Sequence, residues 1–350
     1  MDPRPSAVPL IIATALVAAA AGVAAALAVA AYVLPPTVPD GTTQRAGRSV
    51  QSSTDAEALS RAAAAGVRVF AGAGTATPAG LVYAPEQQRG AGVVLTADGW
   101  IAVERSTWNA EAALISAAGK RLTVERSVDA SAFNLVFLKT DGRDLTVTVF
   151  GDSRTLEAGD GLYAPAAGGF APVLFVSAAL RDGAPSLPET TADFRRRLAL
   201  GTAVVPPGTP VFTGNGELVG LALPIKAGEQ GKALPVEVLR IALGRVLADR
   251  GMAVADIGVR GLPLASVAVP DPALTVRGGW FVTEVRPSTR LGTGRTELRV
   301  GDLVRSVGSD AVTASRPLGE ILAEFSGSAR PELLVLRDGQ ELRIPVTLAP

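Results

Sequence analysis

Hydrophobic residues follow three patterns along the chain, and the first of them predicts a membrane segment. Residues 7–34, AVPLIIATALVAAAAGVAAALAVAAYVL, contain no charged residue. As a helix this stretch would be about 40 Å long, enough to cross a hydrocarbon core of about 30 Å with some tilt. No polar positions recur that would give the helix a solvent-facing side. We therefore expect a transmembrane helix that anchors the chain in a lipid bilayer.

The flanks of this segment bear on its orientation. Residues 1–6 form a very short tail with one arginine, Arg4, so the positive-inside signal is weak. A short tail before a large body fits a signal anchor with its N-terminus in the cytoplasm and its body outside. The small-residue run LAVAAY is also compatible with a signal-peptidase site, so cleavage stays open. Residues 35–54 are rich in Pro, Gly, Ser and Thr, and predict a linker.

Short alternating runs with turn residues between them make up the second pattern, and they predict a β-rich body. Residues 54–70, TDAEALSRAAAAGVRVF, predict a short helix that runs into a strand. GVVLTADGWIAVE, residues 92–104, predicts two strands around an Asp98-Gly99 turn. Further strands at similar spacing predict a sandwich or barrel. Residues 233–251, ALPVEVLRIALGRVLADRG, have helical periodicity and close this body.

The last part of the chain mixes both periodicities and predicts a small α+β domain. WFVTEVRP (280–287) predicts a strand, and LRVGDLVRSVGSDAV (298–312) predicts a strand, a turn and a strand. PLGEILAEFSG (317–327) predicts an amphipathic helix. PELLVLRDGQELRIPVTL (331–348) predicts a hairpin turned at Asp338-Gly339. About 95 residues of this kind are enough for a small closed core.

Composition and charge exclude several classes of function. The 33 Lys and Arg residues balance 33 Asp and Glu residues, which argues against a nucleic-acid partner. We expect the basic run Arg195-Arg196-Arg197 to be a solvated loop or helix face. The chain has no cysteine, which excludes disulfides, thiolate nucleophiles and cysteine-ligated metals. It also has no histidine, so a Ser-His-Asp mechanism is impossible. No loop has calcium-type spacing, and we expect neither a metal nor a cofactor.

Several stretches, in order, resemble the HtrA (Do-like, DegS/DegP-type) serine proteases, whose fold is a trypsin-like double β-barrel followed by a PDZ domain. The resemblance covers about residues 55–350. The stretches that carry it are RGAGVVLTADGWI, FGDSRTLEAGDGLYAPA, FVSAALRDG, VFTGNGELVGLALPI and ALPVEVLRIALGRVL in the first body, and RVGDLVRSVGSDAV and LLVLRDGQELRIPVTL in the second.

The resemblance implies a mainly β fold class: one N-terminal transmembrane helix, a trypsin-like double β-barrel and a C-terminal PDZ-like α+β domain. The implied domains are residues 55–252 for the protease fold and residues 253–350 for the PDZ-like domain. The anchor and the single PDZ-like domain are most similar to the DegS branch.

Carrying the family's catalytic positions onto this chain gives a degenerate triad. The histidine position, seven residues after the Asp-Gly glycine, is Ser106. The aspartate position, before the apolar strand LVFLK, is Asn134. The serine position, three residues before Pro210, is Pro207. Ser106 cannot act as a base near neutral pH, and Asn134 carries no charge. Pro207 lacks both the nucleophilic oxygen and an N–H for the oxyanion hole. We expect no catalytic residue and an inactive serine-protease homologue.

The PDZ resemblance also points to a candidate peptide site. PDZ domains add a peptide to a sheet edge and take its terminal carboxylate in a backbone nest. The family's nest, an aromatic residue followed by Leu or Ile, Gly, and Ile or Val, resembles Asp256-Ile257-Gly258-Val259 here. An acid replaces the aromatic residue. The carboxylate of Asp256 would either repel an incoming C-terminus or point to solvent, and the alternative is that the segment is an ordinary packing strand.

The function expected from these observations is non-catalytic. We expect a membrane-anchored HtrA-like pseudoprotease in the bacterial inner membrane, with a periplasmic body that binds other membrane or periplasmic proteins as a scaffold subunit. A PDZ-based sensor of C-terminal or unfolded peptides is the alternative, and a serine endopeptidase is disfavoured. Because HtrA relatives form trimers, a homotrimer is an inherited possibility.

Overall fold

The computed structural model describes residues 53–348, except residues 73, 79, 167, 185, 203, 205, 227, 253, 255, 265–277, 287–296 and 326–328. All of them belong to one compact unit, Gly47–Pro350. The tail (1–6), the expected transmembrane helix (7–34) and nearly all of the linker (35–54) lie outside the described residues. Within the described ranges, no helix is both long enough and apolar enough to cross a membrane.

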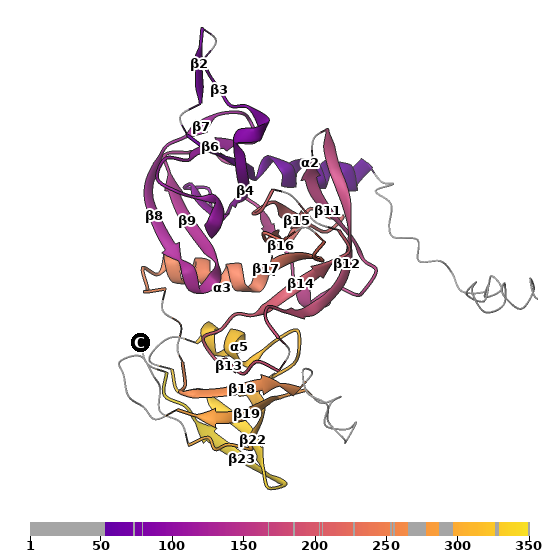
Figure 1. Cartoon of the computed structure of the whole chain (residues 1–350), viewed down its shortest axis with the longest axis vertical. Coiled ribbons are helices and arrows are strands. Elements are labelled where there is room, and N and C mark those ends of the chain that lie inside the picture. The colour runs from indigo at the N-terminus through magenta and orange to yellow at the C-terminus, as the bar shows by residue number, and fades with distance from the viewer. Residues whose placement is uncertain are drawn as a thin grey trace, which may run out of the picture. The chain divides into compact units, whose positions relative to one another are not determined.

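Seven antiparallel strands form the first sheet, in the order β7-β6-β1-β4-β5-β9-β8 (Figure 1). Helix α2 (Ser53–Ala64) leads directly into this sheet. The strands are β1 (Gly66–Phe70), β4 (Gln88–Val94), β5 (Trp100–Glu104), β6 (Ala113–Ser116), β7 (Arg121–Leu122), β8 (Val124–Ala130) and β9 (Leu135–Thr140). A small separate hairpin, β2 (Thr75–Thr77) and β3 (Gly80–Val82), extends from the loop between β1 and β4.

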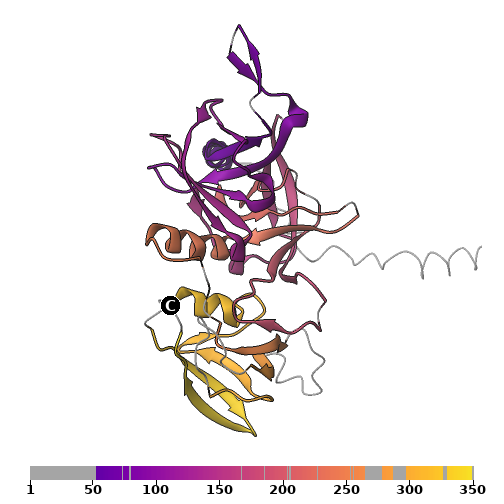
Figure 2. The same ribbon diagram turned by 60° about the vertical axis from the view of Figure 1, so that its left-hand side comes forward.

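The second sheet closes on itself. Its order is β10-β16-β15-β11-β12-β14-β17, and an additional pairing of β16 with β17 closes six of the strands into a barrel (Figure 2). The strands are β10 (Val149–Phe150), β11 (Gly161–Ala166), β12 (Gly169–Arg181), β14 (Arg196–Leu200), β15 (Pro210–Phe212), β16 (Glu217–Ala222) and β17 (Gly231–Pro235). Helix α3 (Val236–Leu247) follows β17 without a loop.

The third sheet contains the C-terminal strands and one strand from the middle of the chain. Its order is β13-β18-β19-β20-β22-β23, with β21 paired to β20. The strands are β13 (Glu189–Thr190), β18 (Val259–Pro263), β19 (Trp280–Val285), β20 (Leu303–Val307), β21 (Asp310–Ala311), β22 (Glu332–Arg337) and β23 (Gln340–Pro345). Helix α5 (Leu318–Glu324) packs with this sheet around a separate core that includes Trp280 and Ile321.

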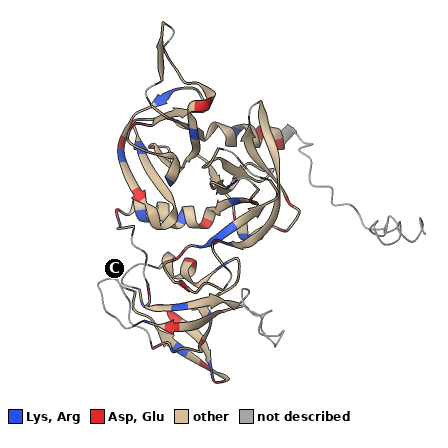
Figure 3. Cartoon of the chain, viewed as in Figure 1, with Lys and Arg blue, Asp and Glu red and all other residues tan. Residues whose placement is uncertain are grey.

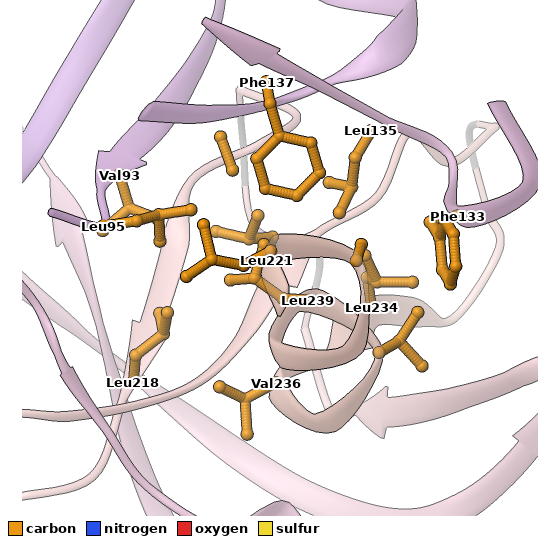
Figure 4. Packing of buried hydrophobic residues seen from close by; sticks show 14 of the residues in the cluster. Val93, Leu95, Phe133, Leu135, Phe137, Leu218, Leu221, Leu234, Val236 and Leu239 are labelled. Carbon is orange, nitrogen blue, oxygen red and sulfur yellow. The ribbon is translucent and has the colours of Figure 1, made fainter. Parts of the chain in front are cut away.

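Both large sheets contribute to a shared core that helix α3 seals (Figure 4). Side chains of β4 and β9, such as Val93 and Phe137, pack in one cluster with Leu218 and Leu221 of β16 and Leu239 of α3. Burial of such side chains is the main stabilising contribution, at about 25 cal/mol per Å² of apolar surface. This core brings the end of β5 and the start of β9 to the region where β15 meets β4.

Most of the predicted elements are confirmed. The helix at residues 54–70 is α2 followed by β1, and the turn of residues 92–104 joins β4 to β5. The hairpin at Asp338-Gly339 joins β22 to β23, with both turn residues at positive φ (50° and 78°), as a two-residue hairpin requires. The helix predicted over residues 233–251 is shorter, since residues 231–235 belong to β17 and the helix ends at Leu247.

The expectation for Arg195-Arg196-Arg197 is wrong. Arg196 and Arg197 lie in strand β14 and are 1% and 8% exposed. Arg196 is buried because it donates to two carboxylates from distant elements, Glu237 of α3 (2.9 Å) and Glu320 of α5 (2.8 and 2.9 Å). Buried charge is tolerated only when it is paired in this way.

Candidate functional site

The three positions of the degenerate triad lie at the ends of neighbouring elements. Ser106 is in the short 3₁₀ helix η2 (Arg105–Thr107) that follows β5. Asn134 ends the turn η3 (Ser131–Phe133) and precedes β9, the strand paired with β5. Pro207 is in the loop between β14 and β15. The fold therefore brings segments that are far apart in the sequence to one place.

A buried carboxylate, Glu104, joins two of these positions. Glu104 is the last residue of β5 and is 1% exposed. Its Oε2 accepts hydrogen bonds from the backbone N–H of Ser106 (2.9 Å) and from the Ser106 hydroxyl. Its Oε1 accepts a hydrogen bond from Nδ2 of Asn134 (2.9 Å). Ser106 and Asn134 thus lie on either side of one carboxylate, which fixes both side chains.

The backbone of Asn134 adds to this arrangement. Asn134 adopts a left-handed conformation (φ 60°, ψ 30°), which asparagine tolerates better than most residues. Its N–H donates to the carbonyl of Ser131 (3.1 Å), and its carbonyl accepts from the N–H of Arg105 (3.1 Å). The conformation and these bonds direct the Asn134 amide at Glu104.

The loop that contains Pro206 and Pro207 lies beside Ala91 and Glu104, and two proline carbonyls and Gly208 fix its position. The Pro206 carbonyl accepts from the N–H (3.2 Å) and the hydroxyl (2.6 Å) of Thr209, and the Pro207 carbonyl accepts from the N–H of Ala91 (2.8 Å). Gly208 adopts φ +81°, and a Cβ there would lie 2.1 Å from the carbonyl oxygen of Ala91 and 3.4 Å from Cβ of Glu104. The prolines are accommodated because this loop uses their carbonyls as acceptors and needs no N–H from them.

The chemistry of this cluster differs from that of a catalytic triad. Ser106 is an exposed residue whose hydroxyl donates to the buried carboxylate of Glu104. Sequence reasoning missed Glu104, because an acid at the end of an apolar strand looks like an ordinary surface residue. Among the residues the structure describes, no group of three or more acidic side chains is arranged to hold a metal ion.

The candidate peptide segment, residues 256–259, lies at the start of β18. The Asp256 side chain is 18% exposed and does not point to solvent. Its Oδ1 accepts a hydrogen bond from the N–H of Gly258 (2.9 Å), and its Oδ2 pairs with the guanidinium of Arg286. Gly258 adopts φ +80°, and its carbonyl accepts from the N–H of Arg286 (2.8 Å). Ile257 and Val259 are fully buried, so this part of the segment packs the domain.

Comparison with known proteins points to one group. No family model matches the chain. The chain is 26% identical over 219 residues to the periplasmic pH-dependent serine endoprotease DegQ of Escherichia coli K12, a match that covers 58% of this chain and 46% of DegQ. It is 24% identical over 272 residues to a DegP-like probable periplasmic serine endoprotease of Pseudomonas savastanoi pv. phaseolicola. This match covers 75% of this chain and 56% of that protein. The chain spans about half the length of these curated relatives.

Solved structures agree on the fold. The HtrA-type protease AlgW with a tripeptide matches at a TM-score of 0.57 and 19% identity, covering 85% of this chain and 97% of the other. AlgW with a decapeptide matches at a TM-score of 0.53 and 19% identity, and the match covers 85% of this chain and 99% of AlgW. These matches confirm the expected mainly β fold with a trypsin-like barrel region and a C-terminal α+β domain. The chain is thus similar in sequence to periplasmic serine endoproteases of the DegQ and DegP-like type, and it has the fold of the HtrA-type proteases.

Proposed function

We propose that this chain is a non-catalytic HtrA-type homologue that binds other proteins. The observation that carries the proposal is the cluster around Glu104, in which Ser106 and Asn134 both donate to one buried carboxylate. In the family resemblance these are the positions of the base and of the acid that orients it. An alcohol and an amide held by a carboxylate can neither accept a proton from a nucleophile near neutral pH nor stabilise an imidazolium.

The nucleophile position supports the same proposal. Pro207 has no side-chain oxygen, and its nitrogen carries no hydrogen to offer to an oxyanion. Loss of one oxyanion-hole donor alone costs about 3–4 kcal/mol of transition-state stabilisation. The carbonyl of Pro207 is engaged by Ala91, which holds the loop in this conformation.

The expected location completes the proposal. The relatives found by sequence are periplasmic proteases. Together with the apolar segment of residues 7–34, this favours a protein anchored in the inner membrane whose periplasmic body recognises a membrane or periplasmic protein. A homotrimer belongs to the same proposal as an inherited possibility.

Proteolysis of an unfolded substrate tests the loss of catalysis. The full chain in mild detergent, incubated with casein, should release no more peptide than buffer, while DegQ under its own working conditions serves as the active reference. The variant S106A should behave like the unaltered chain. Cleavage by the unaltered chain that S106A abolishes would overturn the proposal and assign Ser106 and Glu104 as a nucleophile and its base.

Isolation from native membranes tests the binding role. The full chain, extracted in mild detergent, should co-purify with stoichiometric partners, measured by particle mass and by identification of the accompanying chains. A variant with substitutions at the exposed ion pair of Arg343 and Glu332 provides a surface control. A lone monomer or a homotrimer without other chains would contradict the scaffold role.

A further inference from the structure

Strand β18 presents the sheet edge at which a peptide would add to this domain. One of its edges pairs with β19, and β18 begins at Val259, the last residue of the segment 256–259. Peptide-binding domains of this type use such an edge for main-chain hydrogen bonds and a neighbouring backbone nest for the ligand carboxylate. In this chain the other edge of β18 is not free.

The occupant of that edge is a segment of the chain itself. Strand β13 pairs antiparallel with β18, with Glu189 opposite Gly261 and Thr190 opposite Arg260 (Figure 1). The next residue, Thr191, is 1% exposed and accepts through its hydroxyl a hydrogen bond from the N–H of Ile257 (3.1 Å). Segment 189–191 therefore meets both the strand and the nest, which are the two recognition elements of the edge.

Helix α5 lies against the far side of this segment. A Cβ added at Gly319, the second residue of the helix, would lie 2.5 Å from the carbonyl oxygen of Thr191. Glycine at this position allows the backbone of the segment to approach the helix closely. The segment is thus held between β18 and α5.

Ion pairing and local turns hold the segment in place. Glu189 is 4% exposed and pairs with Arg181 at the end of β12. The N–H of Thr190 donates to the Asp193 carboxylate (2.9 Å), and the N–H of Asp193 donates back to the Thr190 carbonyl (3.2 Å). These contacts preorganise the segment, which reduces the entropy lost when it occupies the edge.

The nest is occupied in a similar way. The Asp256 carboxylate accepts the N–H of Gly258, so an internal acid takes a donor that a terminal carboxylate would use. Arg286 neutralises this acid and holds it there. A second carboxylate arriving at the nest would find the N–H of Gly258 already engaged by Asp256.

We propose that the peptide edge of the C-terminal domain is a binding site for an internal segment of this chain, residues 189–191, and that Asp256 replaces the ligand's terminal carboxylate. The site recognises an extended internal strand rather than a free C-terminus. An outside peptide binds only after residues 189–191 leave the edge. This inference does not depend on whether the chain is catalytic.

Disulfide trapping tests the occupancy directly. The chain has no cysteine, so a pair of introduced cysteines can form only one intramolecular disulfide. The T190C/R260C variant of the full chain should be almost completely cross-linked within the monomer after mild oxidation, because these residues are opposite each other. Non-reducing electrophoresis and mass spectrometry of the linked peptides measure the result.

Two further pairs calibrate the trapping. L334C/R343C, opposite each other in the β22–β23 hairpin, should cross-link equally fast, whereas T190C/R343C should not. A T190C/R260C rate no higher than that of T190C/R343C would overturn the proposal. A disulfide-linked dimer would also overturn it, because the occupant would then come from a second copy.

Peptide binding tests the specificity. The probes are two fluorescent peptides: acetyl-SLPETTAD-amide, from residues 186–193, and SLPETT with a free carboxylate. We expect the unaltered chain to bind neither. E189K, which replaces the partner of Arg181 with a further cation, should release the segment and increase affinity for the amidated probe at least tenfold. The matched reversal E332K, at an exposed pair, should change nothing.

The role of Asp256 is separated by one more variant. Combining D256A with E189K should increase affinity for the carboxylate probe at least fivefold over E189K alone and leave the amidated probe unchanged. Circular dichroism melts establish that each variant is folded. Binding of the carboxylate probe to the unaltered chain as tightly as to E189K would overturn the proposal.

Discussion

Glu104 explains why the side chains of Ser106 and Asn134 are fixed in position. Three donors reach its carboxylate, two from Ser106 and one from Asn134, so the buried charge is compensated by hydrogen bonds. The resemblance to a protease family identified Ser106 and Asn134 from spacing alone. It could not identify Glu104, because no feature of the sequence indicates that a strand-end acid will be buried.

Gly208 is the residue at which the double-proline loop has least freedom. We expect G208A to lower the free energy of unfolding by about 3–5 kcal/mol, because Ala would combine a strained positive φ with a Cβ at 2.1 Å from the Ala91 carbonyl oxygen. Urea denaturation measures the change. G119A is the matched control: Gly119 also has positive φ (79°) but nothing within 4 Å, so a cost of about 1–2 kcal/mol is expected. Equal costs would show that the close approach is relieved.

Asp302 links stability to pH in the C-terminal domain. Burial alone would raise the pKa of Asp302, but hydrogen bonds from Arg337 (2.7 and 2.8 Å) and from the N–H of Arg299 (2.7 Å) outweigh burial and lower this pKa below its ordinary value of 3.8. Because the folded-state pKa is the lower one, the contribution is fully present above about pH 4 and is lost as the pH falls further.

The variant D302N should therefore lose about 2–3 kcal/mol of stability at pH 7. The difference in free energy of unfolding between D302N and the unaltered chain should become smaller at pH 3, as measured by urea unfolding at both pH values. D338N, at an exposed hairpin turn, should leave the free energy of unfolding unchanged at both pH values. A difference that stays constant between pH 7 and pH 3 would contradict the ion-pair explanation.

Among the secondary-structure elements, those with strong local signals were predictable. Helix α2, the two Asp-Gly turns and helix α5 were predicted from hydrophobic periodicity and turn residues, which are signals that lie within each element itself. The burial of β14 was not predictable, because Arg196 is buried only through its pairing with Glu237 and Glu320. These two residues are distant in sequence and meet Arg196 only in the folded chain. Strand β13 was likewise hidden, because a two-residue strand has no measurable alternation.

Arg196 couples strand β14, helix α3 and helix α5 through buried charge. R196M should lower the free energy of unfolding by about 3–5 kcal/mol, because it leaves the carboxylates of Glu237 and Glu320 buried without a cation. Neutralising all three groups, as R196M/E237Q/E320L, should recover at least half of that loss, since no buried charge then needs a counterion and an amide oxygen at position 237 can still accept from Ser153. Chemical denaturation measures both variants, and no recovery would show that the effect comes from packing.

Across the whole chain the two signs of charge are interspersed rather than separated, as Figure 3 shows for the described residues. Recognition by the body must therefore depend on local shape and pairing more than on a long-range field. Among the described residues, the contacts that join the C-terminal sheet and helix α5 to the rest of the molecule include the β13–β18 pairing, the carboxylate pair around Arg196 and the packing of α5 against α3.

These contacts predict how the chain unfolds. Because they lie within one compact unit, we expect a single calorimetric transition for the unaltered chain. The combination E189K/R196M disrupts the β13–β18 pairing and the Arg196 cluster, and should split the transition into two. The exposed double variant R126A/R343A, which breaks only surface pairs, should keep one transition. Two transitions in the unaltered chain would show that the connections are too weak to couple the parts.

Because β13 pairs with β18, an outside peptide must compete with a tethered segment of the same chain for the edge of β18. A segment tethered in this way has an effective concentration on the order of 1 mM. If its own dissociation constant is about 10 µM, an outside peptide meets an apparent dissociation constant about 100-fold above its intrinsic one. Free peptide C-termini at micromolar concentration would then not bind measurably. The edge of β18 would bind only a partner that is held nearby, or one that first displaces residues 189–191.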